Sequence, residues 1–406
     1  MCSSSEMMFD IISNLEDCLS SDKFNTLCDG GLKFFKVSNN YKVGDYICYA
    51  SNRQCALPTL PVLEMQLFEI LPWIKDFIKV SVAPHGFALS FFRSGCFLNG
   101  LKDVEMLGSK YGYNSMYINK VFVLSVIEKN PGSNNLINLR LNVTNNLLKN
   151  VICACGGSFD SSNNKVNETI HIKITNKNLL HKDCINIIVG TVTTDSPSTT
   201  LDSYKSLRMT DIMALCDNKL DGVNVLEERN KILNASVLFD LLQCNVQRSI
   251  ALHLKENDSD KRTSCKGTIF VLYNYARLFS LCARFDDEVL AGVYPELPEL
   301  KNIDFSILAS DDEWQIMFES ILSWPSVVKK SIIDIKSGRL KLHLILDFLK
   351  KISTTFSQYY HKTRVLTEPR IHLLPALFAR MRLLKSLLQV YQNAFNLIDV
   401  TPLQKM

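Results

Sequence analysis

The most restrictive feature of this sequence is the regular spacing of apolar residues from about Val225 to the end. Apolar side chains recur there at i, i+3 and i+4, which places them on one face of an α-helix. The pattern holds in "LEERNKILNASVLFDLLQ", "GTIFVLYNYARLFSLCAR", "DEWQIMFESILSW", "KLHLILDFLKKISTTFSQYYHKT" and "LLPALFARMRLLKSLLQVYQNAFNLI". Such helices are stable when they bury their apolar stripes against one another. The sequence therefore predicts an all-α, antiparallel helical bundle over residues 226–406.

The first half of the chain has a different pattern. Residues 1–105 mix short helical and extended segments, including the predicted strands "IKVSVA" and "FALSFF" around a turn at Pro84-His85-Gly86. This predicts a compact α+β domain. Residues 106–225 contain the strand-like runs "KVFVLSVI", "NVICAC", "IHIKI" and "INIIVGTV" and one helical candidate, "NLRLNVTNNLLKNV". We expect a reduced α/β region there, with Asp195–Ser203 as its most flexible linker.

Composition argues against several classes of protein. The thirteen cysteines lack any C-x-x-C pair and are expected to be buried thiols of a reducing compartment. The seven histidines lack the spacing of a metal site. No apolar run reaches the roughly 18 residues that cross a bilayer, and the first residues lack the apolar core of a signal peptide. The expected protein is cytoplasmic, with no membrane segment and no metal.

Positive charge is concentrated near the C-terminus. The net charge is only +4, yet residues 325–385 carry thirteen Lys or Arg against three Asp or Glu. Such asymmetry favours a polyanionic partner. The alternative is an ordinary solvated helix surface.

The stretch "GTIFVLYNYARLFSLCAR", residues 267–284, carries a second signal. At about 100° per residue, one side is apolar and collects Leu272, Ala276, Phe279 and Ala283, with Tyr275 and Cys282 at its margin. The opposite side collects Phe270, Tyr273, Arg277 and Arg284. Two aromatic rings and two guanidinium groups on one stripe could stack bases. The alternative is a packed helix whose arginines only reach solvent.

The C-terminal helices resemble the DALR anticodon-binding domain that ends arginyl-tRNA synthetases. The resemblance rests on "YNYARL" at 273–278, "FSQYYHKTRVL" at 356–366, "ARMRLLKSLLQVYQNAFNLIDV" at 379–400 and the terminal "PLQKM". The N-terminal part, through "GDYICYA" and "KVSVAPHGFALSF", is similar to the added domain of that synthetase, which implies binding of the tRNA elbow by residues 1–105.

Both ATP-binding motifs of such a synthetase are degraded here. The first has the form H-x-G-H followed by Leu-Arg; Leu139 and Arg140 remain, but Asn135 and Asn138 replace the histidines and Ile137 replaces the glycine. Neutral amides cannot supply the charge of an imidazolium to a transferring phosphate. The second motif should lie near "DSPSTTLDSYKSLRMTDI", where only Lys205 and Arg208 offer charge. We therefore expect a Rossmann-like remnant without adenylation activity, and no cofactor.

This arrangement is similar to the DALR anticodon-binding domain-containing protein 3 family. The resemblance implies a non-catalytic protein that recognises arginine tRNAs and delivers them to a 3-methylcytidine tRNA methyltransferase acting at anticodon-loop position 32. Of Tyr359 and Tyr360, one is expected to belong to the core. The residues expected to bind tRNA are Phe270, Tyr273, Arg277, Arg284, Lys329, Lys330, Lys350, Lys351, Tyr359, Tyr360, Arg364, Lys405 and Met406.

Two other functions remain open from the sequence. One is a minimal or residual arginyl-tRNA synthetase, which the asparagines of the first motif disfavour. The other is a protein-interaction scaffold that binds no RNA, which the charge of residues 325–385 disfavours. The sequence does not indicate which arginine isoacceptors are bound, which surface meets the methyltransferase, what the middle region does, or the oligomeric state.

Overall fold

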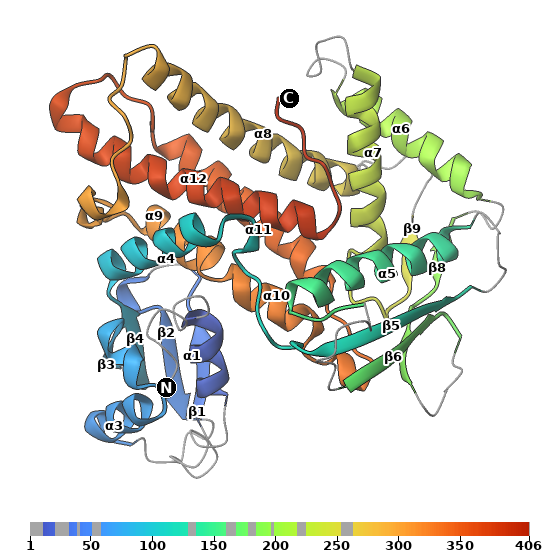
Figure 1. The fold of residues 1–406 in the computed structure, drawn as a ribbon, viewed down its shortest axis with the longest axis horizontal. Helices are drawn as coiled ribbons and strands as arrows, with labels where there is room; N and C mark the ends of the chain where they lie inside the picture. The colour runs from blue at the N-terminus through green and yellow to red at the C-terminus, as the bar shows by residue number, and fades with distance from the viewer. Residues whose placement is uncertain are drawn as a thin grey trace. The chain divides into compact units, whose positions relative to one another are not determined.

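The computed structural model forms two compact units, each built from separate parts of the chain (Figure 1). Unit 1 comprises Met1–Tyr111, Phe285–Ser326 and Gln358–Leu387, and unit 2 comprises Gly112–Arg284, Val327–Ser357 and Leu388–Met406. The residues described are 11–20, 32–38, 41–50, 58–128, 135–159, 168–177, 184–195, 199–216, 225–252 and 263–405. The division into 1–105, 106–225 and 226–406 stays a prediction.

Unit 1 contains a four-stranded antiparallel sheet in the order β1-β2-β4-β3. The strands are β1 (Leu32–Lys36), β2 (Tyr46–Ala50), β3 (Ile78–Ala83) and β4 (Gly86–Phe91). The β3–β4 pair confirms the two predicted strands, with Val80 opposite Leu89 and His85 at φ 75° in the turn between them. Helices α1 (Ile11–Leu19), α3 (Leu60–Ile70) and α4 (Arg93–Leu107) complete this part.

The core of unit 1 joins this sheet to residues far along the chain. Helix α9 (Asp311–Gln315), which a π-helical turn extends, holds Trp314 completely buried. The Trp314 indole N–H donates a 2.6 Å hydrogen bond to the Asp45 carboxylate, and Phe91 N donates another at 2.6 Å. Burial raises the pKa of Asp45, although these hydrogen bonds oppose the shift. A buried carboxylate needs such partners, so the two segments depend on each other.

Unit 2 contains a parallel sheet, β5-β6-β7, formed by β5 (Lys120–Ile127), β6 (Glu168–Thr175) and β7 (Ile185–Ile188). Helix α5 (Leu136–Ala154) follows β5 and confirms the helical candidate. The expected strand "NVICAC" is wrong, because residues 150–154 form the end of α5, where their apolar side chains continue its buried face. A short apolar run fits either structure by periodicity alone.

Unit 2 also contains a parallel pair of short strands, β8 (Val192–Thr194) and β9 (Ile250–Leu252). Two helices lie between these strands in the sequence. These are α6 (Leu201–Cys216) and α7 (Val225–Leu241). Helix α6 begins inside the expected linker, where Ser203 N donates to the Thr200 hydroxyl at 3.2 Å. Residues 196–198 of that linker lie outside the described residues.

The remaining long helices are α8 (Thr263–Leu290), α10 (Trp324–Ile332), α11 (His343–Lys362) and α12 (Leu374–Leu397). They confirm that the C-terminal part is helical. Among the described residues after position 225, the short β9 is the only strand. Within unit 2, the buried Tyr275 ring of α8 lies 5.3 Å from that of Phe395 and 6.0 Å from that of Tyr391 on α12, measured between centroids. These edge-on contacts fix the buried face of α8 and therefore its opposite face.

Candidate nucleic-acid interface

Helix α8 presents its aromatic and basic stripe away from the core. Leu272 and Ala276 are buried, whereas Phe270 is 38% exposed and Arg284 is exposed. The two residues between them on the stripe, Tyr273 and Arg277, are half-buried. The helical spacing in the sequence thus predicts correctly which side faces solvent. All four side chains lie on unit 2.

Tyr273 and Arg277 act as one group. The Arg277 guanidinium donates a short hydrogen bond to the Tyr273 hydroxyl, and its central carbon lies 4.5 Å from the Tyr273 ring centroid. One turn earlier, the side chain of the buried Asn274 donates to the Phe270 carbonyl at 2.8 Å. A guanidinium over a ring is attracted to its π face and loses rotamer freedom. The stripe is therefore a pre-ordered polar and aromatic surface.

The C-terminal tail lies along the same side of α8. The Ser280 hydroxyl, one turn after Arg277, donates to the Gln404 carbonyl at 3.4 Å, and Lys405 is exposed next to it. At the start of the tail, the Asn150 amide of α5 donates to the Leu397 carbonyl at 3.0 Å. Met406 lies outside the described residues. Ser280, which the sequence analysis missed, thus helps to hold the tail beside Lys405 against α8.

The four lysines expected to contact phosphates lie on two helices. Lys329 and Lys330 are on α10, half-buried and exposed respectively, and Lys350 and Lys351 are on α11. Lys350 forms an ion pair of 3.4 Å with Asp347, and both side chains are more than 40% exposed. An exposed pair of this kind contributes about 0–1 kcal/mol, so a phosphate can replace the carboxylate at little cost.

Three candidates at the end of α11 differ in accessibility. Tyr359 is completely buried, which corrects its assignment as an RNA contact: its ring is part of the core of unit 1, and burial raises the pKa of its hydroxyl. Its neighbour Tyr360 is 38% exposed. Arg364 is exposed as well and donates to the Leu366 carbonyl at 3.3 Å. We retain Tyr360 and Arg364 as candidates.

The degraded first ATP motif forms the N-terminus of α5. Asn135 is the N-cap, and its side-chain oxygen accepts a 2.8 Å hydrogen bond from Asn138 N. The Asn138 side chain is buried and donates to the Glu128 carboxylate at 3.2 Å. Side-chain capping satisfies backbone donors that would otherwise be open to an anion at a helix start. The Asn135 amide therefore caps the helix, and the Asn138 amide connects its first turn to Glu128.

Arg140, which remains from the same motif, is completely buried. Its guanidinium donates to three carbonyl oxygens: Gly190 at 2.7 Å, Arg248 at 2.8 Å and Leu241 at 3.0 Å. Burial lowers its pKa, an effect that the nearby Cys244 opposes. Arg140 therefore connects α5 to the end of α7 and to the loops beside β8 and β9.

Arg208, from the expected second motif, is buried too. Its guanidinium donates a 2.9 Å hydrogen bond to the Asp240 carboxylate, and a second guanidinium nitrogen lies 3.1 Å from Asp211. The Asp240 carboxylate also accepts a 2.6 Å hydrogen bond from the Tyr204 hydroxyl. Burial raises the pKa of Asp240, and Arg208 and Tyr204 oppose the shift. This network packs α6 against α7, which leaves Arg208 unavailable to a ligand in solvent.

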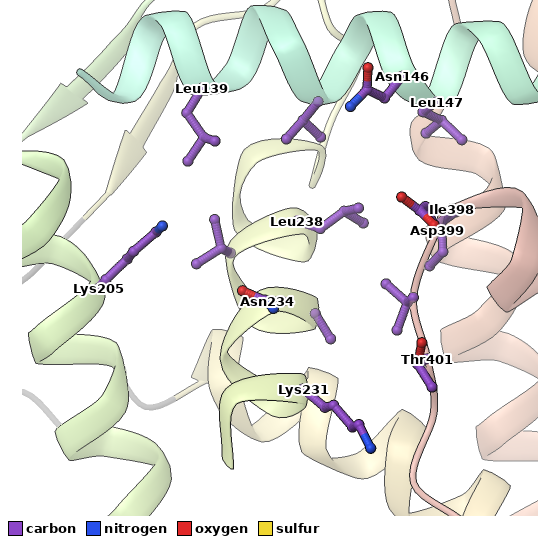
Figure 2. A pocket seen from close by; sticks show the side chains of 14 residues that line it. Leu139, Asn146, Leu147, Lys205, Lys231, Asn234, Leu238, Ile398, Asp399 and Thr401 are labelled. Carbon is purple, nitrogen blue, oxygen red and sulfur yellow. The ribbon is translucent and has the colours of Figure 1, made fainter. Parts of the chain in front are cut away.

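Lys205, the other charged residue of that segment, borders a pocket of about 330 Å³ in unit 2 (Figure 2). Side chains of α5 and α7, among them Leu139 and Leu238, form its walls, and Ile398–Thr401 of the tail close one side. Lys231 at its edge is ion-paired with Glu227 at 2.7 Å. The walls combine aliphatic with polar side chains, and the pocket-lining residues include no histidine, cysteine or aromatic residue.

In the described part of the chain, no helix is both long and apolar enough to cross a membrane. Within the same residues, no three His, Cys, Asp or Glu side chains are grouped so that they could hold a metal ion.

Comparison with known proteins defines the class of this domain. Residues 271–406 match the family model of the DALR anticodon binding domain. The fold is that of an arginyl-tRNA synthetase: the Plasmodium falciparum enzyme superposes with a TM-score of 0.58 at 10% identity, covering 98% of each chain. The C-terminal third thus matches a DALR anticodon-binding domain.

Two similar curated proteins are both named DALR anticodon-binding domain-containing protein 3. The Danio rerio protein is 26% identical over 230 residues, covering 54% of this chain and 41% of the relative. The Rattus norvegicus protein is 30% identical over 176 residues, covering 42% of this chain and 32% of the relative. These matches confirm the resemblance seen in the sequence. They also show that the chain matches less than half the length of these relatives.

Proposed function

We propose that this chain is a non-catalytic tRNA-binding protein that recognises arginine tRNAs and delivers them to a 3-methylcytidine tRNA methyltransferase acting at anticodon-loop position 32. The observation that carries the proposal is the α8 stripe, in which Phe270 and Arg284 are exposed and Tyr273 and Arg277 are half-buried. The stripe begins one residue before the segment 271–406 that matches an anticodon-binding domain and continues into it. Arginine specificity and the methyltransferase follow from the resemblance. Tyr360, Arg364, Lys405 and Met406 are proposed as further contacts.

Stacking and phosphate binding divide between different elements in this proposal. Unstacked anticodon bases are recognised by stacking on rings and guanidinium groups, which α8 offers at fixed spacing. Lys329, Lys330, Lys350 and Lys351 are proposed to contact the RNA backbone, which positions the RNA without selecting its sequence.

Residues 1–105 are proposed to hold the tRNA elbow. Strand pairing places Lys33 and Phe35 of β1, Tyr49 of β2 and Lys79 of β3 on one face of the sheet. Phe35 is 53% exposed, both lysines are exposed, and the Phe35 and Tyr49 rings lie 6.2 Å apart. Exposed rings flanked by lysines suit a nucleic acid with accessible bases.

The chain is expected to catalyse no arginine-dependent exchange of pyrophosphate with ATP. Each group that stabilises charge in a phosphate-transfer transition state contributes roughly 3–4 kcal/mol. Both histidines are replaced by asparagines, of which Asn135 caps α5 and Asn138 donates to Glu128. The assay uses purified chain with arginine, ATP and labelled pyrophosphate, and an active arginyl-tRNA synthetase serves as the positive control. Exchange above background would support the residual synthetase instead.

Replacing Arg277 with alanine is expected to weaken binding of arginine tRNAs by about 1–3 kcal/mol, the size of a lost directed base contact. Weak binding of other tRNAs should change little. Tyr273→Ala should give a smaller loss spread over more tRNAs, because stacking tolerates any base. The measurement is a filter-binding titration at one fixed salt concentration, with Lys149→Ala on the exposed face of α5 as the control.

If these variants lose affinity equally for arginine tRNAs and other tRNAs, at an unchanged melting temperature, the α8 stripe has only a structural role. In cells, Arg277→Ala should lower 3-methylcytidine in arginine tRNAs and leave that mark unchanged in other tRNAs. A chain that binds no tRNA at all would support the scaffold function.

A further inference from the structure

Helix α3 of unit 1 exposes apolar side chains on its outer side as well as burying them on its inner side. Its sequence, LPVLEMQLFEI, contains two glutamates and no basic residue. Leu63 and Leu67 are buried on one side, and on the other Val62 is 38% exposed and Met65 62% exposed. At about 100° per residue, the exposed Glu69 lies between Val62 and Met65 on this outer side, so the side mixes apolar with acidic side chains. The outer face of α3 therefore has the character of an interface.

Apolar exposure continues onto the strand that α3 packs against. This strand, β3, lies at the edge of the sheet and pairs only with β4 among the described strands (Figure 1). Its Val82 is 72% exposed. Between α3 and β3, the half-buried rings of Trp73 and Phe77 lie 6.1 Å apart in an edge-on arrangement. Proteins usually protect an edge strand with charge or a covering element. The exposed Lys79 supplies charge near the start of β3, whereas Val82 near its end does not.

The charges on this side limit what can cover it. Helix α3 and the turn after it carry three carboxylates, Glu64, Glu69 and Asp76, and one lysine, Lys75. Phosphates of RNA are repelled by such a surface. A symmetric contact with a second copy would bring the same carboxylates together, which disfavours a homodimer. The surface suits a protein with an apolar groove and basic side chains.

We infer that Val62, Met65 and Val82, together with Glu69 between the first two and Glu64 beside them, form a docking surface for a protein partner that presents an apolar groove with Lys or Arg side chains. This inference rests on the proposed function, because it takes the 3-methylcytidine tRNA methyltransferase to be that partner. The apolar side chains lie in the groove, and the two glutamates meet its basic side chains. The α8 stripe then remains available to the tRNA.

The test measures binding of the purified methyltransferase from the same organism to the full chain without RNA, by biolayer interferometry. Met65→Glu is expected to weaken binding at least tenfold, because it places a charge in a desolvated groove. Glu69→Lys should slow association, and the effect should shrink as salt rises. The matched control is Met106→Glu on α4, since Met106 is 59% exposed and lies away from α3 in the sequence.

The outcomes separate this inference from the proposed function. If the wild-type chain binds the methyltransferase and Met65→Glu binds equally well, the docking surface is overturned and the proposed function stands. If the wild-type chain binds tRNA but no methyltransferase, the delivery function fails together with the inference. A loss with Met65→Glu but not with Met106→Glu, at unchanged tRNA affinity and melting temperature, supports docking at α3.

Discussion

Replacing Arg140 with methionine is expected to lower the free energy of unfolding of unit 2 by about 3–5 kcal/mol, because three carbonyl acceptors lose their donor. Methionine fills similar space, but the carbonyls of Gly190, Leu241 and Arg248 lose a donor inside the protein. Each buried acceptor without a partner costs about 1–3 kcal/mol, and relief of the buried charge offsets part of the total. Thermal unfolding followed by circular dichroism measures the change.

Two companion variants show whether the three hydrogen bonds cause this loss. Arg140→Lys keeps the charge, but its ammonium cannot reach three carbonyls at once. Its melting temperature should therefore lie between those of the wild type and Arg140→Met. Lys149→Met, on the exposed face of the same helix, should change the melting temperature little. If Arg140→Met has the same melting temperature as Lys149→Met, the guanidinium contributes nothing to the stability of the fold.

Raising the salt concentration from about 50 to 200 mM is expected to weaken tRNA binding by about 60- to 1,000-fold. This follows from a slope of roughly −3 to −5 in log affinity against log salt, if about four to six basic side chains neutralise phosphates. Lys350→Glu with Lys351→Glu should weaken all tRNAs alike and reduce that slope, because backbone contacts carry no sequence information. Fluorescence anisotropy at several salt concentrations gives both quantities.

The control for the double reversal is Lys149→Glu, which reverses a charge of unit 2 on a different helix, α5. Its slope should stay close to that of the wild type. An affinity that does not depend on salt would contradict phosphate binding and favour the scaffold function.

Periodicity in the sequence predicts the structure best where contacts are local. The two faces of α8 follow from helical spacing, and the β3–β4 hairpin follows from alternation around Pro84–Gly86. The same reasoning fails at residues 150–154, because β-branched and small apolar residues fit a strand as well as the end of a buried helix. Strand β9 is only three residues long and gives too short a signal.

The sequence is least informative where a role depends on distant partners. Arg140 and Arg208 resemble parts of a ligand site, yet their partners are carbonyls and carboxylates about 30 to 110 residues away. Tyr359 and Tyr360 are adjacent and chemically identical, and only packing decides that the first is buried. No local pattern in α3 distinguishes an exposed apolar face from a buried one. Long-range packing settles each case.

The hydrogen bond between Asp45 and Trp314 has a consequence for synthesis on the ribosome. The strands around Asp45 emerge early, but Trp314 is translated 269 positions later. At about 5–20 residues per second, the N-terminal sheet waits tens of seconds for the indole that completes its interior. During that interval the apolar side of the sheet is not yet covered by the segment that contains Trp314. The nascent chain is therefore expected to depend on ribosome-associated chaperones more than a small four-stranded sheet ordinarily would.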